Sequence, residues 1–556
     1  MSNTVTITDI RLENKKLYMS INAEIEGEKT LSMPKLKFYF NTDGEDRILP
    51  IVIEEGKYED ETWHLYGSFV YELNNIFWKK QSKTQDFNGY IYQFDGSENF
   101  KAIKLDIETK NIENEFYKIT FNDSSFNIKI DNKNKLVDSK KTMKMLQRTV
   151  AVVYYWLWNI VEFIPRIFGK VPFSANRGSI FHKCSEYSKR IVIKKLYEKY
   201  SKETIVNNQI LFLSQRSDKL EGNLKIVYDE MSKLDNYRVE ILLDTTFLYD
   251  MTYKKMKNFA KLCAKSSIII ADEYVPQLYV FDIRNQSKVV QLWHACGAFK
   301  TFGFSRLGKP DGSKQKSRVH RNYDLAIVSS ESIRQCYAEG FGIPLDYVVA
   351  TGVPRTDLLF DEIYKRSKVE ELYKKYPVLK GKKVVLFAPT FRGTVKENAY
   401  YPMDKFNIKN LMVNLGDEYV LLIKHHPFVT EEVKIPNDLK DRVIDVKNYP
   451  EINDLLLITD VLITDYSSVI FEGAILNKKM VFYVFDLEEY IKERDFYFDF
   501  KEFIPGSVVK TEKELIEAIN DEEFDRNNLE IFKSKYIDAC DGNATKRVVD
   551  LIRELN

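Results

Sequence analysis

"KVVQLWHACG", residues 288–297, holds the pattern that decides the fold of this chain. A short apolar run leads directly to His294, and a turn of small residues follows it. A continuous apolar run of this length is typical of a strand buried on both faces of a parallel sheet. Ligands bind beyond the carboxyl ends of such strands. His294 is therefore expected either to face a ligand or to be a core histidine held by backbone groups.

The same pattern recurs from residue 205 onward, where apolar runs alternate with amphipathic helical segments in two series. The first series contains "QILFLS", "VEILLD", "SIIIADE", "VVQLWHACG", "LAIVSSE" and "YVVATGVPR". The second contains "VVLFAPTFRG", "YVLLIKHHPF", "VIDVKNYP", "DVLITDYSSVIFEGAIL" and "KMVFYVFDLEEY". They predict an α/β protein with two facing Rossmann-like lobes, residues 205–370 and 371–556. Neither a G-x-G-x-x-G nor a Walker-type loop appears, which disfavours dinucleotide and ATP binding.

The N-terminal region, residues 1–130, has a different pattern. Short runs such as "KLYMSINAEI" and "HLYGSFVYEL" alternate polar and apolar residues, and turn clusters such as Asp43-Gly44 separate them. This spacing predicts an antiparallel β-sandwich of immunoglobulin-like type. The region contains no cluster of catalytic residue types, so a docking or spacer module is expected.

Residues 131–204 form a basic, aromatic-rich linker, and residues 131–200 carry 15 Lys/Arg against 5 Asp/Glu. The run "TVAVVYYWLWNIVEFI", residues 149–164, is too short to span a bilayer. One interpretation is an amphipathic helix lying on an anionic membrane surface, with residues 140–200 making the contact. The other is a helix packed on the next domain with its aromatic side chains in the core.

Composition excludes several classes of protein. With 44% hydrophobic and 30% charged residues and a net charge of +1, the chain is a folded protein without a global field for nucleic acid. Five cysteines without metal-ligand spacing argue against a zinc site and for a reducing compartment. The N-terminus lacks the basic and apolar pattern of a signal peptide.

The residues at the predicted strand ends are rich in cations and hydroxyls, and they would line one cleft if the lobes face each other. They are Trp293, His294, Gly297, Arg355, Pro389, Thr390, Arg392, Lys424, His425, His426, Asp465, Ser467, Ser468 and Glu472. The cations suit a phosphorylated substrate, and the serine pair before a helix offers hydroxyls and free N–H groups. An ordinary helix cap is the alternative for the serine pair.

Five motifs in this order resemble the CDP-glycerol glycerophosphotransferase family of teichoic acid synthesis, and most of all its poly(ribitol-phosphate) polymerase and primase group. They are "WHACGAFKTFGFS", "GVPRTDLLFDE", "LFAPTFRG", "KHHPF" and "TDYSSVIFEGAILNKKMVFYVFDLEEY". The family's Trp-His-Gly motif falls on Trp293-His294, with Ala295 and Cys296 standing before Gly297. Its His-Pro and double-serine motifs fall on His426-Pro427 and Ser467-Ser468.

The resemblance implies a GT-B fold and the transfer of ribitol phosphate from CDP-ribitol to the terminal hydroxyl of a lipid-linked teichoic acid chain, with release of CMP. It places the protein peripherally on the cytoplasmic face of a Gram-positive cell membrane. CDP-glycerol as donor, a sugar-nucleotide glycosyltransferase of cell-wall or capsule synthesis, and a catalytically inactive scaffold are the alternatives. A nucleic-acid partner is not expected, and the sequence does not fix the oligomeric state.

Attack of a hydroxyl on phosphorus requires a base and cations around the phosphoryl oxygens. His294 is the candidate base, because imidazole is neutral at cytoplasmic pH. His426 is expected to hydrogen-bond the diphosphate and stabilise the leaving CMP. No carboxylate cluster suggests Mg²⁺, so a metal-independent reaction without a cofactor is expected. The basic loop at residues 300–321 either guides an anionic polymer or is simply solvated.

Overall fold

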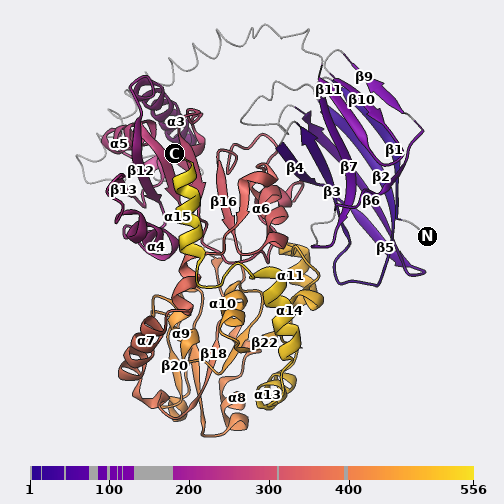
Figure 1. Ribbon diagram of the computed structural model, residues 1–556. Coiled ribbons are helices and arrows are strands. Elements are labelled where there is room, and N and C mark those ends of the chain that lie inside the picture. The colour runs from indigo at the N-terminus through magenta and orange to yellow at the C-terminus, as the bar shows by residue number, and fades with distance from the viewer. Residues whose placement is uncertain are drawn as a thin grey trace.

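The computed structural model describes residues 3–13, 16–42, 45–73, 86–96, 100–108, 110–114, 117–130, 180–309, 312–393 and 398–555. It contains an N-terminal pair of packed sheets and two lobes, each built on a parallel sheet (Figure 1). The predicted interface helix at residues 149–164 lies outside the described residues.

The described part of residues 3–130 forms two sheets, in the orders β5-β6-β2-β1-β8 and β4-β3-β7-β11-β10-β9. Their strands are β1 (Thr4–Glu13), β2 (Lys16–Glu26), β3 (Lys35–Thr42), β4 (Glu45–Pro50), β5 (Glu55–Glu59), β6 (Thr62–Glu72), β7 (Asp86–Phe94), β8 (Lys104–Asp106), β9 (Asn111–Glu113), β10 (Tyr117–Phe121) and β11 (Phe126–Ile130). Alternate residues point inward, and Ile21, Phe38 and Phe126 of the two sheets share one core. The described part of this region is thus a pair of packed sheets. It is not fully antiparallel, because β1 pairs in parallel with β8.

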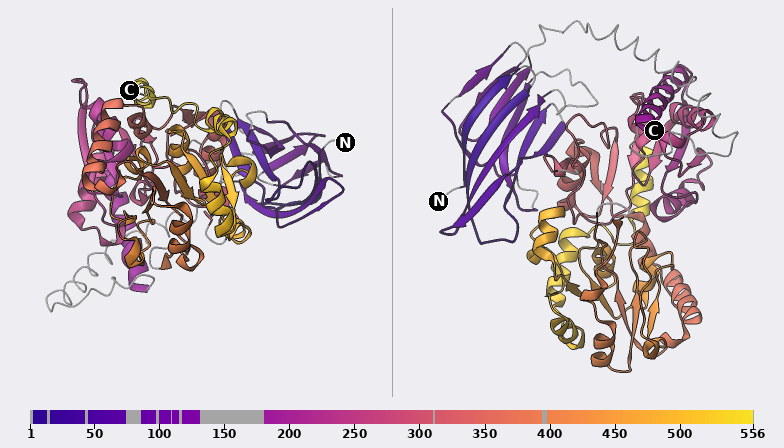
Figure 2. Two further views of the ribbon diagram at one scale, coloured as in Figure 1. Left: turned by 90° about the horizontal axis from the view of Figure 1, so that it is seen from below. Right: turned by 180° about the vertical axis from the view of Figure 1, so that it is seen from behind.

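The sandwich is attached firmly to the first lobe (Figure 2). Lys37 of β3 forms a buried ion pair with Glu339 of α6 (Arg334–Phe341), with 3.0 Å between Nζ and Oε2. Arg47 of β4 donates to the carbonyl of Gly342, at the end of the same helix. Since both charges of the Lys37–Glu339 pair are shielded from water, separating the sandwich would leave each of them unpaired.

The second half of the basic linker is a helix, α3 (Ile180–Tyr200), and it packs on the first lobe. Val192, Ile193, Leu196 and Tyr197 are buried in the core of that lobe. For residues 180–200 the structure thus favours the packed helix over the membrane-surface helix. No helix within the described ranges combines the length and apolarity that a bilayer crossing needs.

The first lobe has a parallel sheet in the order β13-β12-β14-β15-β16-β17. Its strands and main helices are β12 (Val206–Ser214), α4 (Gly222–Met231), β13 (Arg238–Leu243), α5 (Tyr253–Lys265), β14 (Ser266–Ala271), β15 (Lys288–Gln291), β16 (Leu325–Val328), α6 and β17 (Val348–Ala350). The next helix, α7 (Glu362–Lys375), packs on the second lobe instead, where the Tyr364 hydroxyl donates to Asp454 Oδ1 at 2.5 Å. Every residue of β14 is buried, as expected for a strand covered on both faces.

The second lobe repeats this plan in the order β20-β19-β18-β21-β22-β23. Its elements are β18 (Lys383–Phe387), α8 (Ile408–Leu415), β19 (Tyr419–Ile423), β20 (Val443–Asp445), α9 (Ile452–Leu457), β21 (Val461–Thr464), α10 (Val469–Ile475), β22 (Lys479–Tyr483), α11 (Leu487–Arg494), α12 (Phe500–Phe503), β23 (Ser507–Val509), α13 (Glu512–Asn520) and α14 (Arg526–Tyr536). The edge strand β23 was not predicted from the sequence.

The last helix, α15 (Ala544–Glu554), leaves the second lobe and returns to the first. Val548 and Ile552 are fully buried against Leu224 of α4. The lobe boundary predicted from sequence, residues 371–556, is therefore wrong for this helix. Sequence periodicity identifies an amphipathic helix but does not say which sheet its apolar face meets.

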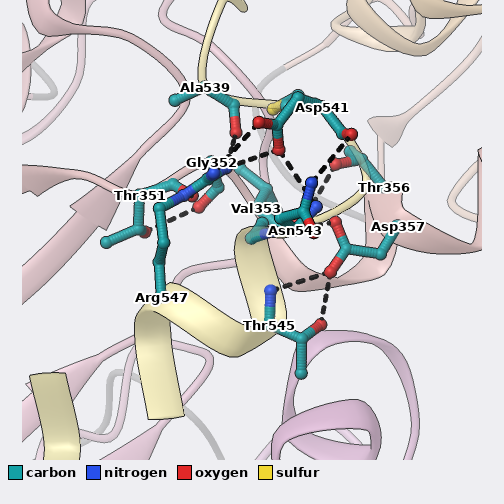
Figure 3. A network of polar contacts seen from close by, with 12 residues as sticks. Thr351, Gly352, Val353, Thr356, Asp357, Ala539, Asp541, Asn543, Thr545 and Arg547 are labelled. Atoms are coloured by element: carbon teal, nitrogen blue, oxygen red, sulfur yellow. Dashed lines mark hydrogen bonds and ion pairs between the residues drawn. The ribbon is translucent and has the colours of Figure 1, made fainter. Parts of the chain in front are cut away.

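A polar network fixes the start of α15 (Figure 3). The Asp357 carboxylate accepts hydrogen bonds from the backbone N–H groups of Ala544 and Thr545, at 3.0 and 2.7 Å, and from the Thr545 hydroxyl at 2.6 Å. Arg547 donates to the carbonyl of Thr351 at 2.8 Å and pairs with Asp541. Asp357 thus caps a helix that is distant in sequence and offsets its N-terminal partial charge.

We expect Asp357→Ala to lower the free energy of unfolding by about 1–2 kcal/mol, because two N–H groups of α15 lose their acceptor. Thermal unfolding followed by calorimetry measures this change. Asp550→Ala is the matched control on α15, since its carboxylate lies 3.5 Å from Arg553 in an exposed pair that contributes little. Equal destabilisation by the two substitutions would contradict the capping role.

Candidate active site

The site lies at the seam where the two lobes meet. Lys300 of the first lobe pairs through its backbone with Phe496 of the second, and Thr301 N–H donates to the carbonyl of Asp495 at 3.2 Å. The Arg355 guanidinium, after β17, forms an ion pair with Glu472 of α10. Residues that follow strands of both sheets are thus held together, as the strand-end rule predicts.

A strained turn presents His294 beyond the end of β15. Trp293 has a φ of 51°, in the left-handed region that bulky residues rarely adopt. Its N–H donates to Gln291 Oε1 at 2.8 Å, and its carbonyl accepts from Asn223 Nδ2 at 2.7 Å. Backbone strain of this kind persists only where surrounding contacts hold it, and it is common at functional sites.

Glu273, which follows β14, lies beside His294. Its Oε2 is 3.2 Å from His294 Nδ1, within ion-pair distance although the ring is not aligned for a hydrogen bond. A carboxylate at this position favours the tautomer with the proton on Nδ1, which leaves Nε2 free to accept a proton. The side chain of His294 remains 37% exposed, so a substrate can reach it.

Burial lowers the pKa of His294, and the positive charges of Arg216 and Arg355 lower it further. The Glu273 carboxylate opposes this effect, while burial raises its own pKa. Burial and the two cations outweigh this opposing charge, so the pKa of His294 stays below its ordinary value. His294 is therefore a neutral imidazole at pH 7, the form that can act as a base.

His426 follows β19, and its Nε2 can donate a hydrogen bond, whereas Nε2 of His294 can accept one. The N–H of Phe428 donates to His426 Nδ1 at 3.2 Å, so in the neutral ring the proton is on Nε2. Burial lowers its pKa to about 4, with contributions from the charges of Lys300, Arg216 and Lys424. His426 is thus a neutral hydrogen-bond donor at pH 7. Its ring rests between Phe391 and Phe428, each 4.7 Å away between centroids.

Two cations at the seam were not among the predicted site residues. Arg216, after β12, lies 3.8 Å from Glu273 Oε2, and its charge acts on both histidines. Lys300 is half-buried, which lowers its pKa to about 8, and within the described ranges no ion pair holds its ammonium group. Arg216 stands two residues beyond the predicted run "QILFLS", and Glu273 is the last residue of the predicted run "SIIIADE", so the strand-end rule could have found them. Lys300 was grouped with the basic loop.

Two cations predicted to bind phosphate are instead occupied within the protein. Arg392 is buried and donates to Asp465 Oδ2 at 2.9 Å, to Asp486 Oδ2 at 2.6 Å and to the carbonyl of Thr390 at 2.7 Å. Lys424 Nζ donates to the carbonyls of Lys447 and Tyr449, both at 2.6 Å. Buried charges need such partners, so these side chains hold the strand ends in place.

Asp465 and Glu472 are likewise committed to internal contacts. Asp465 is buried, and its Oδ1 accepts from the N–H of Thr390 at 2.7 Å. Glu472 is only 2% exposed and pairs with Arg355, whose backbone N–H donates to Asn223 Oδ1 at 2.8 Å. Glu472 was predicted to line the ligand cleft, but here its carboxylate joins the two lobes.

The remaining predicted residues occupy three kinds of position. Trp293 packs on Phe302 and Phe341, and His425 on Phe387 and Tyr401, so both rings belong to aromatic clusters of their own lobes. Pro389 and Thr390 are buried behind the seam. Ser467 and Ser468 are half-buried at the start of α10, and Ser467 Oγ accepts from the N–H of Val469 at 3.4 Å.

Together these groups can carry out proton transfer beside an anion. His294 can accept a proton, His426 can donate a hydrogen bond, and Arg216 and Lys300 supply positive charge. The described ranges contain no group of three His, Cys, Asp or Glu side chains placed to hold a metal ion. The four cysteines whose side chains are described are free and buried.

Comparisons of the sequence with a family model and with known proteins agree on one family. A family model described as CDP-Glycerol:Poly(glycerophosphate) glycerophosphotransferase matches residues 196–554. A teichoic acid poly(ribitol-phosphate) polymerase of Bacillus spizizenii is 45% identical over 357 residues, which are 64% of this chain and 58% of that protein. The ribitol-phosphate polymerase TarK of Staphylococcus aureus is 40% identical over 378 residues, 67% of this chain and 74% of TarK. The match thus spans less than two thirds of the first relative.

A solved structure shares the fold. The wall teichoic acid polymerase TagF superposes with a TM-score of 0.55 at 20% sequence identity, covering 72% of this chain and 98% of that chain. At this identity the likeness shows the fold alone.

We expect Gly297→Ala to destabilise the seam, because the added Cβ would lie 2.2 Å from the Phe471 ring of α10 and Gly297 has a φ of 65°. Phe471 is fully buried and cannot move aside, so the loss should exceed the roughly 1 kcal/mol of left-handed strain alone. Thermal unfolding measures it. Gly381→Ala is the control, since that glycine has a similar φ of 72° but nothing within 4 Å of its Cβ position. Equal losses at the two glycines would mean that the contact with Phe471 does not matter.

Proposed function

Because the chain belongs to the CDP-Glycerol:Poly(glycerophosphate) glycerophosphotransferase family, we propose that it transfers ribitol phosphate from CDP-ribitol to the terminal hydroxyl of a membrane-linked teichoic acid chain and releases CMP. The observation that carries the proposal is the pairing of His294 and Glu273 opposite His426 at the seam. Ribitol is the preferred alditol because relatives 40–45% identical are named ribitol-phosphate polymerases.

In the proposed reaction the acceptor hydroxyl attacks the phosphorus that carries ribitol. A new P–O bond forms, the bond to the oxygen of CMP breaks, and His294 Nε2 takes the hydroxyl proton. Glu273 stabilises the resulting imidazolium. The Nε2–H of His426 donates to the phosphate that becomes CMP, so charge is balanced as the leaving group departs.

Positive charge at the seam supports the same step. Arg216 and Lys300 would neutralise the phosphoryl oxygens, and the hydroxyls of Ser467 and Ser468 would donate to the diphosphate. The proposal includes no metal ion and no cofactor. Chelation by EDTA should therefore leave the rate of CMP release unchanged.

The proposal also covers placement in the cell and the finer architecture. Two facing lobes with a returning C-terminal helix make up the GT-B arrangement, with the acceptor on the first lobe and the CDP donor on the second. The sandwich would be an immunoglobulin-like docking module. Residues 140–200 would contact the anionic cytoplasmic face of the membrane through cations left exposed on α3, such as Lys195 and Lys199, together with the linker before it.

CDP-glycerol is the second candidate donor. The description of the matching family names CDP-glycerol, and a poly(glycerol phosphate) polymerase of Staphylococcus epidermidis is 26% identical over 401 residues. Ribitol and glycerol carry the same diphosphate chemistry and differ only in chain length, so the seam described above would serve either donor.

We expect CMP release from CDP-ribitol with a lipid-linked primer, and a loss of about 10²–10⁴-fold in kcat for His294→Ala, the contribution typical of a general base. His64→Ala is the matched control, because His64 is exposed on the sandwich. CMP release from CDP-glycerol alone would transfer the assignment to the second donor. Undiminished release by His294→Ala would remove the base, and no release from either donor would favour a sugar-nucleotide enzyme or an inactive scaffold.

The pH dependence of kcat/KM tests the neutral state of His294. Protonation inactivates the base, and because its pKa is lowered, activity should stay level from about pH 7 to 6 and fall on the acid side only at lower pH. Arg216→Ala removes a charge that lowers this pKa, so the acid limb should move toward the ordinary histidine value. Arg238→Ala, an exposed arginine of β13 paired with Glu240, is the control. An acid limb that does not move in Arg216→Ala would contradict this placement of Arg216.

A further inference from the structure

A cavity of about 520 Å³ lies in the first lobe, away from the seam residues. Its walls come from the ends of β12 and β13, from the segment after β14, and from α5. These elements lie together on one side of the first lobe in Figure 1. Since the sheet is parallel, the cavity opens at the same carboxyl edge that carries His294. Neither the sequence motifs nor the proposed reaction assigns it a role.

The helix that lines this cavity is strongly basic. α5 carries five lysines and no acidic residue, and four of the lysines line the cavity. Lys255 is paired with Asp244, with 2.8 Å between Nζ and Oδ1. Lys254, Lys257 and Lys261 are exposed, and across the described ranges no carboxylate lies within ion-pair distance of them. Three unpaired ammonium groups at one mouth create a local positive potential for an anion.

The floor of the cavity is apolar, which separates it from an ordinary solvated lysine surface. Leu242, Met251, Phe259 and Val275 line it beneath the ammonium groups. A half-open cavity lined by apolar side chains and lysines fits a ligand with a carbon backbone and phosphate groups. Lysine suits this role, because a flexible ammonium group binds phosphate as a point charge without a fixed planar geometry.

The cavity is connected to the proposed base by adjacent residues. Gln215 lines the cavity, Arg216 follows it, and Arg216 lies beside Glu273, which in turn lies beside His294. The ends of β13, β12, β14 and β15 follow one another along the sheet. At the usual strand spacing, the cavity is about 10–15 Å from His294. An anionic chain whose end is at His294 would cross Arg216 and reach the lysines.

We propose that this lysine cavity binds a phosphodiester of the acceptor chain, behind the terminal hydroxyl that reacts at His294. The inference rests on the proposed function and deepens it, since it assigns the acceptor a second contact on the first lobe. Each added unit lengthens the chain by one phosphate, so a site that recognises phosphate without fixed geometry can hold successive units. Long acceptors should therefore bind more tightly than short ones.

The test uses the full chain and the variant with Lys254→Ala, Lys257→Ala and Lys261→Ala. The probe is a soluble poly(glycerol phosphate) oligomer, whose binding is measured by calorimetry at several salt concentrations and without any donor. We expect the affinity of the triple variant for the oligomer to be about tenfold lower, which is the combined effect of losing three exposed charge contacts. Its affinity should also depend less on salt concentration than that of the wild type. Substituting the same three lysines by arginine should restore binding. A variant that binds the oligomer as tightly as the wild type would overturn the proposal.

Two controls separate the other outcomes. Lys374→Ala, Lys380→Ala and Lys513→Ala together remove the same charge from exposed positions outside the cavity, and they should leave oligomer affinity unchanged. If the control variant loses as much oligomer affinity as the cavity variant, net charge alone explains the loss and the proposal is overturned. So would a variant that loses binding only to phosphatidylglycerol vesicles, because the ligand would then be a lipid headgroup.

The same variant tests the inference independently of the proposed function. With a single-unit acceptor, too short to reach the cavity, kcat should be unchanged, while KM for a long acceptor should rise. If the wild type releases no CMP from either donor, the proposed function fails. The binding measurement still decides whether the cavity holds a phosphodiester chain, because it needs no turnover.

Discussion

The ion pair between Arg355 and Glu472 is the contact on which the site depends. One partner follows a strand of the first lobe, the other lies on a helix of the second, and Glu472 is only 2% exposed. Burying two charges is costly, and removing either partner would leave the other buried and unpaired, which is costlier still. The pair therefore favours the arrangement in which His294 and His426 share one seam. Asn223 extends the constraint, since its side chain contacts both the carbonyl of Trp293 and the N–H of Arg355.

The sequence predicted the architecture well because burial on both faces leaves a simple pattern. The run "IIIA" in β14 has no polar face, which is typical of a strand in a covered parallel sheet. The position of α15 was not predictable in this way. Its apolar face meets α4, more than 300 residues away in sequence, and the Asp357 cap that fixes it is an ordinary aspartate in the sequence.

The sequence predicted a location for the candidate site. It did not predict which of the residues there face a ligand and which have a structural role. The strand-end rule predicted that His294, His426 and Arg355 line one cleft. It could not separate cations that face a ligand from cations that stabilise the strand ends, because both follow strands. Arg392 and Lys424 belong to the second group, since their donors are occupied by Asp465, Asp486 and backbone carbonyls. Only side-chain partners, which depend on the folded chain, distinguish them from Arg216 and Lys300.

Because Arg392 and Lys424 are occupied within the protein, the positive charge available to a ligand comes from other residues. A net charge of +1 provides no general attraction for an anionic polymer, so attraction must come from local groups of cations. The two histidines are neutral at pH 7, which keeps them available for proton transfer and hydrogen bonding but removes them as counter-ions. Arg216, Lys300 and the lysines of α5 must then supply the positive charge. In the proposed path, Arg216 would supply positive charge between the α5 lysines and His294, because it follows Gln215 of the cavity wall and lies beside Glu273.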